Sequence, residues 1–280
     1  MKRIVLPTDF SDNSRHAIAC ALDIFREEHC EFILLNVFGA DVYSTANTMA
    51  LQSGDAVLDA VIKRSERDLE NLRQMLENKK SESHSFRTVS RYSFISEAIN
   101  SLLKEERIDL VVMGTKGATG AREIWFGSNT VTVMENVTGC PVLAIPASYH
   151  YKRPGEILFP SSFEYRYREE EVEAVCELAR KFKAAVRVMH ISEEDVLSKE
   201  QRENKQRLMQ YFEPLECSSH TLSNFEPETA IRCFVQARDI DMIALVNHKH
   251  GFFESIFRKS TVKELGYHST VPLLVMHRKE

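Results

Sequence analysis

The same order of strand-like and helix-like segments occurs twice along this chain, and this repeat restricts the folds that the chain can adopt. Short apolar runs, typical of strands buried in a parallel sheet, alternate with segments whose apolar residues recur at helical spacing. The strands expected in the first half are residues 3–7, 32–37, 86–89, 108–113 and 141–145. Alternation of this kind predicts a parallel sheet with helices on both of its faces.

The second half repeats the same order. Its expected strands are residues 156–160, 185–191, 217–221, 241–246 and 271–276. The spacing between matched segments shrinks along the chain, mainly because the second copy lacks a counterpart of the loop-like insertion at residues 38–55. The repeat therefore predicts an α/β fold of two tandem Rossmann-like domains, residues 1–147 and residues 154–280, joined by a polar linker that contains Pro and Gly.

Composition and charge exclude several classes of protein. The chain has 280 residues, which is long enough for two domains with cores of their own. Its net charge of −5 lacks the basic excess that a broad nucleic-acid or anionic-membrane surface needs. No apolar run is long enough for a signal peptide or a membrane span, so we expect a cytoplasmic protein without a membrane partner. The six cysteines form no CxxC pair, which favours small buried side chains over a zinc site or a disulfide framework.

Glycine is concentrated in one loop of the first half. Five of the ten glycines lie between positions 114 and 139, where the chain leaves an expected strand and enters an expected helix. Gly114 and Gly117 would let backbone N–H groups approach a ligand without interference from a Cβ atom. Gly127 and Ser128 would start the helix, whose exposed N–H groups and dipole favour an anion. The spacing fits neither a P-loop nor a dinucleotide fingerprint, so the residues alone leave open both a phosphate site and a glycine-rich connection without a ligand.

The spacing of this loop resembles the signature of a known family. Gly114-x2-Gly117-x9-Gly127-Ser128 is similar to the nucleotide-binding motif G-x2-G-x9-G-[S/T] of universal stress proteins. Residues 4–11 (IVLPTDFS) resemble that family's first strand and turn, and residues 140–143 (CPVL) resemble its last strand. The resemblance covers nearly the whole first half. It implies a five-stranded parallel sheet in the order 3-2-1-4-5, with ATP at the carboxyl ends of the strands.

The resemblance also implies which residues meet the nucleotide. Asp9 would lie near the adenosine, the backbone of Val37 would contact the adenine, and the glycines with Ser128 would take the ribose and the phosphates. Asn129 stands where the family often has Val, which a contact through the backbone N–H tolerates. The full set of expected nucleotide-binding residues is Pro7, Thr8, Asp9, Val37, Met113, Gly114, Gly117, Gly127, Ser128 and Asn129.

Some groups near this loop have a simpler interpretation beside the functional one. Asp9 is equally suited to cap the first helix or its turn. Lys116 and Arg122 are favoured as solvated charges over phosphate ligands. We expect one ATP per chain, accompanied by Mg²⁺ that its phosphates and water would mainly hold.

The second half lacks the glycine arrangement. Asn247, His250 and Lys259 stand where the first half has its three signature glycines, and Ser162 stands where it has Asp9. Side chains would fill the space that the phosphates need, so we expect no ATP here in the family manner. The H-x-H pair that ends at His250 suggests a metal site, but two ligands are too few, and exposed loop histidines are favoured.

No catalytic constellation is visible in the sequence. It has no nucleophile elbow, zinc-protease motif or kinase signature. The chain is therefore interpreted as a tandem universal stress protein that binds ATP as a sensor or stabilising ligand. A scaffold that ignores nucleotide and a slow ATP-hydrolysing enzyme stay open as alternatives. The resemblance further implies that residues 142–145 and 273–275 pair the two halves through their last strands, while a homodimer also stays open.

Overall fold

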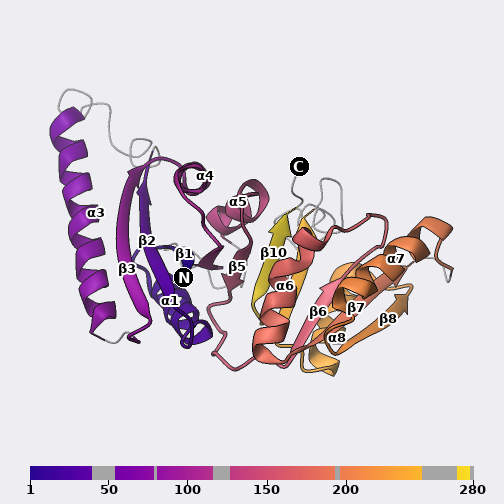
Figure 1. The fold of residues 1–280 in the computed structure, drawn as a ribbon. Coiled ribbons are helices and arrows are strands. Elements are labelled where there is room, and N and C mark those ends of the chain that lie inside the picture. The colour runs from indigo at the N-terminus through magenta and orange to yellow at the C-terminus, as the bar shows by residue number, and fades with distance from the viewer. Residues whose placement is uncertain (40–53, 79–80, 116–126, 193–195, 248–269, 278–280) are drawn as a thin grey trace. The chain divides into compact units, whose positions relative to one another are not determined.

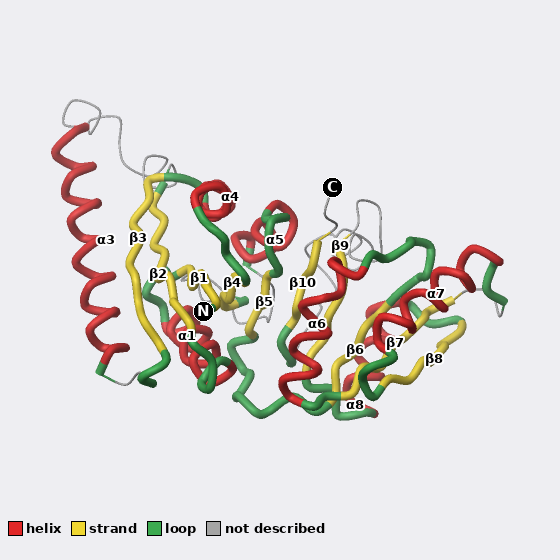
Figure 2. The backbone as a smooth tube through the Cα atoms, in the orientation of Figure 1, coloured by secondary structure: helices red, strands yellow, loops and turns green. Residues whose placement is uncertain are grey.

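Two compact units make up the chain, and the main change from the first to the second falls between Val142 and Leu143. The computed structural model describes residues 1–39, 54–78, 81–115, 127–192, 196–247 and 270–277. Strands and helices alternate through the described residues, as Figure 2 shows. The α/β fold expected from the sequence is confirmed, and its neighbouring strands run parallel.

The described residues of the first half form five strands (Figure 1). These are β1 (Lys2–Pro7), β2 (Cys30–Phe38), β3 (His84–Tyr92), β4 (Leu110–Gly114) and β5 (Val142–Ile145). The helices between them are α1 (Asp12–Ile24), α3 (Gly54–Glu77), α4 (Ile95–Glu105) and α5 (Ser128–Asn136). Their order in the sheet is β3-β2-β1-β4-β5, which confirms the order that the family resemblance implied.

The second half repeats this plan. Its strands are β6 (Glu156–Pro160), β7 (Ala185–Ser192), β8 (Cys217–Ser223), β9 (Met242–Asn247) and β10 (Leu273–His277). The described helices between them are α6 (Glu169–Phe182), α7 (Lys199–Phe212) and α8 (Pro227–Ala237). The strand order is β8-β7-β6-β9-β10, the same permutation as in the first half. The segment between β9 and β10 includes residues 248–269, which lie outside the described residues.

Helices cover both faces of the first sheet. Connections between parallel strands are right-handed, so a reversal in the direction of strand order moves the helix to the other face. The chain goes from β1 through β2 to β3 and then returns to β4 and β5, which places α1 and α3 on one face and α4 and α5 on the other. The central strands carry the core, and Ile4, Val5 and Leu6 have no exposed surface.

The third strand of each half is longer than its sequence pattern predicted. Residues 86–89 read as a short, weak strand, but β3 has nine residues and pairs in register with β2 from Cys30 opposite His84 to Phe38 opposite Tyr92. β8 likewise extends to Ser223 along β7. Pairing with a strong neighbouring strand therefore decided the length of these strands, since their own apolar periodicity is poor.

Both halves use the same contact to hold the start of the first strand. In the first half, Asp109 accepts a hydrogen bond from the Arg3 N–H at 2.8 Å, and its own N–H donates to the Arg3 carbonyl at 2.9 Å. In the second half, Asp241 accepts from the Glu156 N–H at 3.0 Å and donates to the Glu156 carbonyl at 2.9 Å. This shared backbone contact supports the interpretation of the halves as two copies of one plan.

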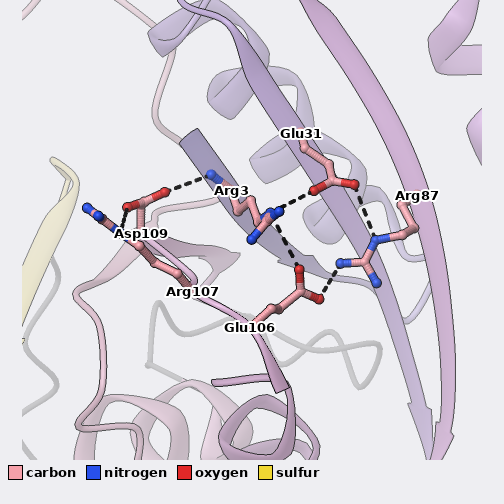
Figure 3. A network of polar contacts seen from close by, with 6 residues as sticks. All are labelled: Arg3, Glu31, Arg87, Glu106, Arg107 and Asp109. Atoms are coloured by element: carbon pink, nitrogen blue, oxygen red, sulfur yellow. Dashed lines mark hydrogen bonds and ion pairs between the residues drawn. The ribbon is translucent and has the colours of Figure 1, made fainter. Parts of the chain in front are cut away.

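A ring of four charged side chains joins three strands of the first half at the end remote from the strand carboxyl termini (Figure 3). Arg3 contacts Glu31 at 3.1 Å and Glu106 at 3.5 Å. Arg87 contacts Glu31 at 3.4 Å and also pairs with Glu106. Because each charge faces two of opposite sign, the ring fixes β1, β2 and β3 against the loop that follows α4.

The cysteines differ in part from expectation. Four of them are buried, namely Cys20, Cys30, Cys140 and Cys176. Cys217 is half-buried and Cys233 is exposed, so the prediction of burial was wrong for Cys233, which lies on the outer side of α8. None of the helices in the described residues is long and apolar enough to cross a membrane.

Candidate functional site

The turn after β1 extends the strand by one residue and then reverses sharply. The Thr8 N–H donates to the Leu35 carbonyl at 2.8 Å, which continues the pairing of β1 with β2. The buried Thr8 hydroxyl accepts from the Phe10 N–H and lies 3.0 Å from the Ser14 hydroxyl. These bonds hold Phe10 at φ 63°, in the left-handed region that a bulky residue seldom adopts. Strain of this kind is often found at functional sites.

Asp9 stands exposed at the tip of this turn. Its carboxylate accepts from the Ser11 N–H at 3.1 Å and from the Ser11 hydroxyl at 2.6 Å, while Ser11 is itself the N-cap of α1. Desolvation by the surrounding protein raises the pKa of Asp9, but hydrogen bonds to its carboxylate, chiefly those from Ser11, together outweigh it and hold that pKa below its ordinary value. The turn-capping role therefore holds. The carboxylate is also ionised at neutral pH and remains accessible to a donor from outside.

The end of β2 offers backbone groups beside this turn. In a parallel sheet, alternate residues direct their N–H and carbonyl groups to alternate neighbours. The Leu35 carbonyl accepts from the N–H of Thr8, which follows β1. The Phe38 carbonyl accepts from the N–H of Ser93, which follows β3. Val37 therefore faces the β1 side, at a point where β1 has already ended at Pro7.

A buried polar network fixes the ends of these strands. The Asn36 side chain donates to the Thr8 carbonyl at 2.7 Å and accepts from the Ser65 hydroxyl of α3 at 2.8 Å. Ser65 in turn lies 2.7 Å from the Ser90 hydroxyl of β3. Sequence reasoning missed this network. Its one visible signal was polar residues at otherwise apolar strand and helix positions.

Two hydrogen bonds hold the start of α5 against the end of β4. The Gly127 N–H donates to the Thr115 carbonyl at 2.5 Å, and the buried Thr130 hydroxyl donates to the Gly114 carbonyl at 2.9 Å. Gly127 is the N-cap of α5 and has no side chain with which to cap it, while Ser128 and Asn129 are exposed. Within the described residues no side chain caps α5, which leaves the N–H groups of Ser128 and Asn129 for an anion that the helix dipole also favours.

Gly114 has a structural reason for being glycine. A Cβ atom there would lie 2.3 Å from Nδ2 and 3.0 Å from the backbone oxygen of Asn13, in the first turn of α1. Glycine therefore lets α1 pack closely on the end of β4. This requirement exists without a ligand, and it stands beside the predicted approach of a phosphate.

The predicted site residues that the structure describes come from neighbouring elements. Pro7 ends β1 and Thr8 and Asp9 follow it, Val37 lies near the end of β2, and Met113 and Gly114 end β4. Gly127 is the N-cap of α5, which begins with Ser128 and Asn129. Because β2, β1 and β4 are adjacent and parallel, all of these strand ends meet at one edge of the sheet. Gly117, Lys116 and Arg122 lie outside the described residues. Among the described residues, no three His, Cys, Asp or Glu side chains gather as a metal site would require.

The matching turn of the second half has the same backbone geometry. The Ser161 N–H donates to the Met189 carbonyl at 2.8 Å, the Phe163 N–H donates to the Ser161 hydroxyl at 3.1 Å, and Phe163 has φ 57°. Ser162 takes the place of Asp9, and its hydroxyl donates to the carboxylate of Glu164 at 3.2 Å.

Side chains of the second half's own helix α7 occupy this second turn. Gln201 donates to the Ser162 carbonyl at 3.1 Å, and Asn204 donates to the Phe163 carbonyl at 2.9 Å. The Phe163 ring is fully buried and stacks on His190 with 4.9 Å between centroids. The turn is thus completed from within the chain. The H-x-H pair of this half lies outside the described residues.

Comparison with known proteins agrees with this architecture. A sequence model described as the universal stress protein family matches residues 1–146. Universal stress protein MJ0531 of Methanocaldococcus jannaschii is 30% identical over 144 residues, which are 51% of this chain and 81% of that protein. Universal stress protein MJ0577 of the same organism is 27% identical over 153 residues, with coverage of 51% and 94%.

A solved structure extends the likeness to both halves. The crystal structure of a universal stress protein from Archaeoglobus fulgidus aligns over 99% of this chain and 97% of its own, with a TM-score of 0.68. Its sequence identity is 18%, so this likeness shows the fold alone.

Proposed function

The chain belongs to the universal stress protein family, and from this premise we propose that its N-terminal half binds one ATP as a regulatory ligand. The observation that carries the proposal is the start of α5, which presents uncapped N–H groups and is tied by hydrogen bonds to the end of β4. An anion is the ligand that such a group of donors favours. The glycine signature, which resembles the family's nucleotide motif, supports a phosphate as that anion.

Each strand end has a role in the proposal. Asp9 accepts hydrogen bonds from the adenosine, since its carboxylate is ionised and exposed. The backbone of Val37 meets the adenine beyond the end of β1. Gly114, Gly117, Gly127 and Ser128 take the ribose and phosphate contacts, and Asn129 offers its backbone N–H. Mg²⁺, where present, would be held mainly by phosphate oxygens and water.

The second half does not bind ATP in this manner under the proposal. Its first turn has Ser162 at the position of Asp9, and two of the carbonyl groups of that turn already accept from Gln201 and Asn204. A bound nucleotide would have to displace these contacts. We therefore propose one nucleotide per chain, with the second half as a partner domain.

The proposal is tested by titrating the purified chain with ATP in a calorimeter. We expect one site per chain, and Gly127→Val to lower the affinity about tenfold or more, since added methyl groups would stand where the phosphate approaches. Gly127 has φ −59° and ψ 151°, a conformation open to Val, so the backbone should not be strained. Lys259→Val, at the matching place in the second half, is the control and should leave the affinity unchanged.

Two rival functions have distinct outcomes in the same experiment. No heat and no thermal shift with ATP would favour a scaffold that ignores nucleotide. Phosphate release that disappears in Gly127→Val would favour a slow ATP-hydrolysing enzyme. A cytoplasmic location stays a prediction, tested by cell fractionation.

We also propose that the last strands of the two halves pair with each other. β5 and β10 are each the last strand of their half's order, and they are apolar except for His277 at the end of β10. Uncovered apolar strand edges promote aggregation, so each needs a partner. If β5 and β10 of one chain pair with each other, the chain should sediment as a monomer. A homodimer in sedimentation would favour pairing of these strands between two chains.

A further inference from the structure

Thr115, the first residue after β4, carries a buried hydroxyl that pairs with no group in the described part of the chain. The residue is 3% exposed, and its Oγ1 has no hydrogen-bond partner among the residues that the structure describes. Its own carbonyl is taken by the Gly127 N–H, and the neighbouring Gly114 carbonyl is taken by Thr130. A buried hydroxyl without a partner destabilises a protein, so its presence here calls for a group that satisfies it.

The strand geometry directs this hydroxyl toward the start of α5. Successive side chains of a strand point to opposite faces of the sheet. The Cβ direction of Gly114 meets Asn13 of α1, so the side chain of Thr115 lies on the opposite face, which is the face of α5. The bond from the Gly127 N–H to the Thr115 carbonyl places the backbone of Thr115 beside the N-cap of α5.

We propose that Thr115 is a further nucleotide-binding residue, whose hydroxyl donates a hydrogen bond to a phosphate oxygen. This inference rests on the proposed binding of ATP to the same half. Thr115 occupies one of the positions that the glycine signature leaves unspecified. The motif therefore assigns no role to this residue. In the second half His248 stands at the matching place, and no hydroxyl is retained there.

The test compares Thr115→Val with Thr115→Ser in the full chain. Val keeps the branched shape and removes the hydroxyl, whereas Ser keeps the hydroxyl. We expect Val to lower the ATP affinity about tenfold or more, which is the effect of a lost hydrogen bond to a charged group. Ser should bind ATP within about twofold of the original chain. If Val does not fold, Thr115→Ala takes its place.

Two further measurements separate a ligand contact from a structural role. The midpoint of thermal unfolding without nucleotide should be unchanged or higher in Thr115→Val, because a buried polar group without a partner is removed. Adenosine should bind this variant as it binds the original chain. Unchanged ATP affinity in Thr115→Val would overturn the inference, and an equal loss for adenosine would overturn the assignment to phosphate. If the original chain itself does not bind ATP, the proposed function fails first.

Discussion

Phe10 and Phe163 hold the left-handed conformation at matching places in the two halves. In both turns a hydroxyl, from Thr8 or Ser161, accepts the N–H of the strained residue. Ser162 stands in place of Asp9 in the second turn, and its hydroxyl bonds the N–H and the carboxylate of Glu164. A carboxylate at the position of Asp9 is therefore not needed for this geometry. The turn is built by hydroxyl and backbone groups, and Asp9 is placed at its tip.

The strain at Phe10 can be measured with two substitutions. Phe10→Gly and Phe10→Ala remove the same ring, but Ala retains the steric conflict of a Cβ atom at positive φ. We expect the Gly variant to be more stable than the Ala variant by about 1 kcal/mol, although Gly is usually the less stable of the two. Urea unfolding measures the difference. An Ala variant as stable as the Gly variant would show that the turn relaxes without cost.

Asp9 should contribute to stability in a manner that depends on pH. Its pKa in the folded chain is below the ordinary value of 3.8, because of the bonds from Ser11. Its contribution is then fully present above the unfolded-state pKa and is lost as the pH falls through the folded-state pKa. The difference in unfolding free energy between the original chain and Asp9→Asn should be larger at about pH 7 than at about pH 3. An equal difference at both values would mean that the bonds from Ser11 do not depend on the charge.

At the scale of elements, α5 depends on one buried hydroxyl for its attachment to β4. Thr130→Val removes the bond to the Gly114 carbonyl and leaves that buried carbonyl without this donor. We expect a loss of about 1–3 kcal/mol in unfolding free energy, together with weaker ATP binding, since the helix start would no longer be fixed. Thr132→Val, on the same helix and half-buried, is the control and should change stability by less than about 0.5 kcal/mol.

The ring of charges in Figure 3 joins elements at the edge opposite the candidate site. Glu106→Gln leaves Arg3 and Arg87 with Glu31 as their shared partner. We expect a loss of about 0.2–1 kcal/mol that shrinks as salt is added, with ATP binding unchanged. Glu105→Gln, which removes an exposed carboxylate paired with Arg91, should have a smaller effect. A loss that does not depend on salt would contradict an electrostatic role for the ring.

The sequence predicted the type and order of the described elements because each strand and helix carries its own periodicity. It underestimated β3 and β8, whose length depends on pairing with a neighbour. It predicted from Gly127 and Ser128, which are local signals, that a helix starts here. It missed Thr130 and Asn36, because the partner of each belongs to a distant segment of the chain.

At the scale of the whole molecule, two copies of one plan should respond differently to nucleotide. Saturating ATP stabilises the form that binds it, by about 2.7 kcal/mol at a hundred times Kd. Hydrogen exchange should therefore slow in the strands and helices of the first half, with little change in β6 and β7. Equal protection of both halves would contradict one site per chain or show that the halves open together.

The bonds from Gln201 and Asn204 to the second turn also bear on how this half can change over evolutionary time. Any single substitution that clears space for a nucleotide there would first leave a carbonyl group of the turn without its donor. Three glycines and a carboxylate would still be missing, so no ligand would offset that loss. Each early substitution toward a nucleotide site in this half therefore lowers stability without a gain in binding, so the divergence of the second copy is hard to reverse.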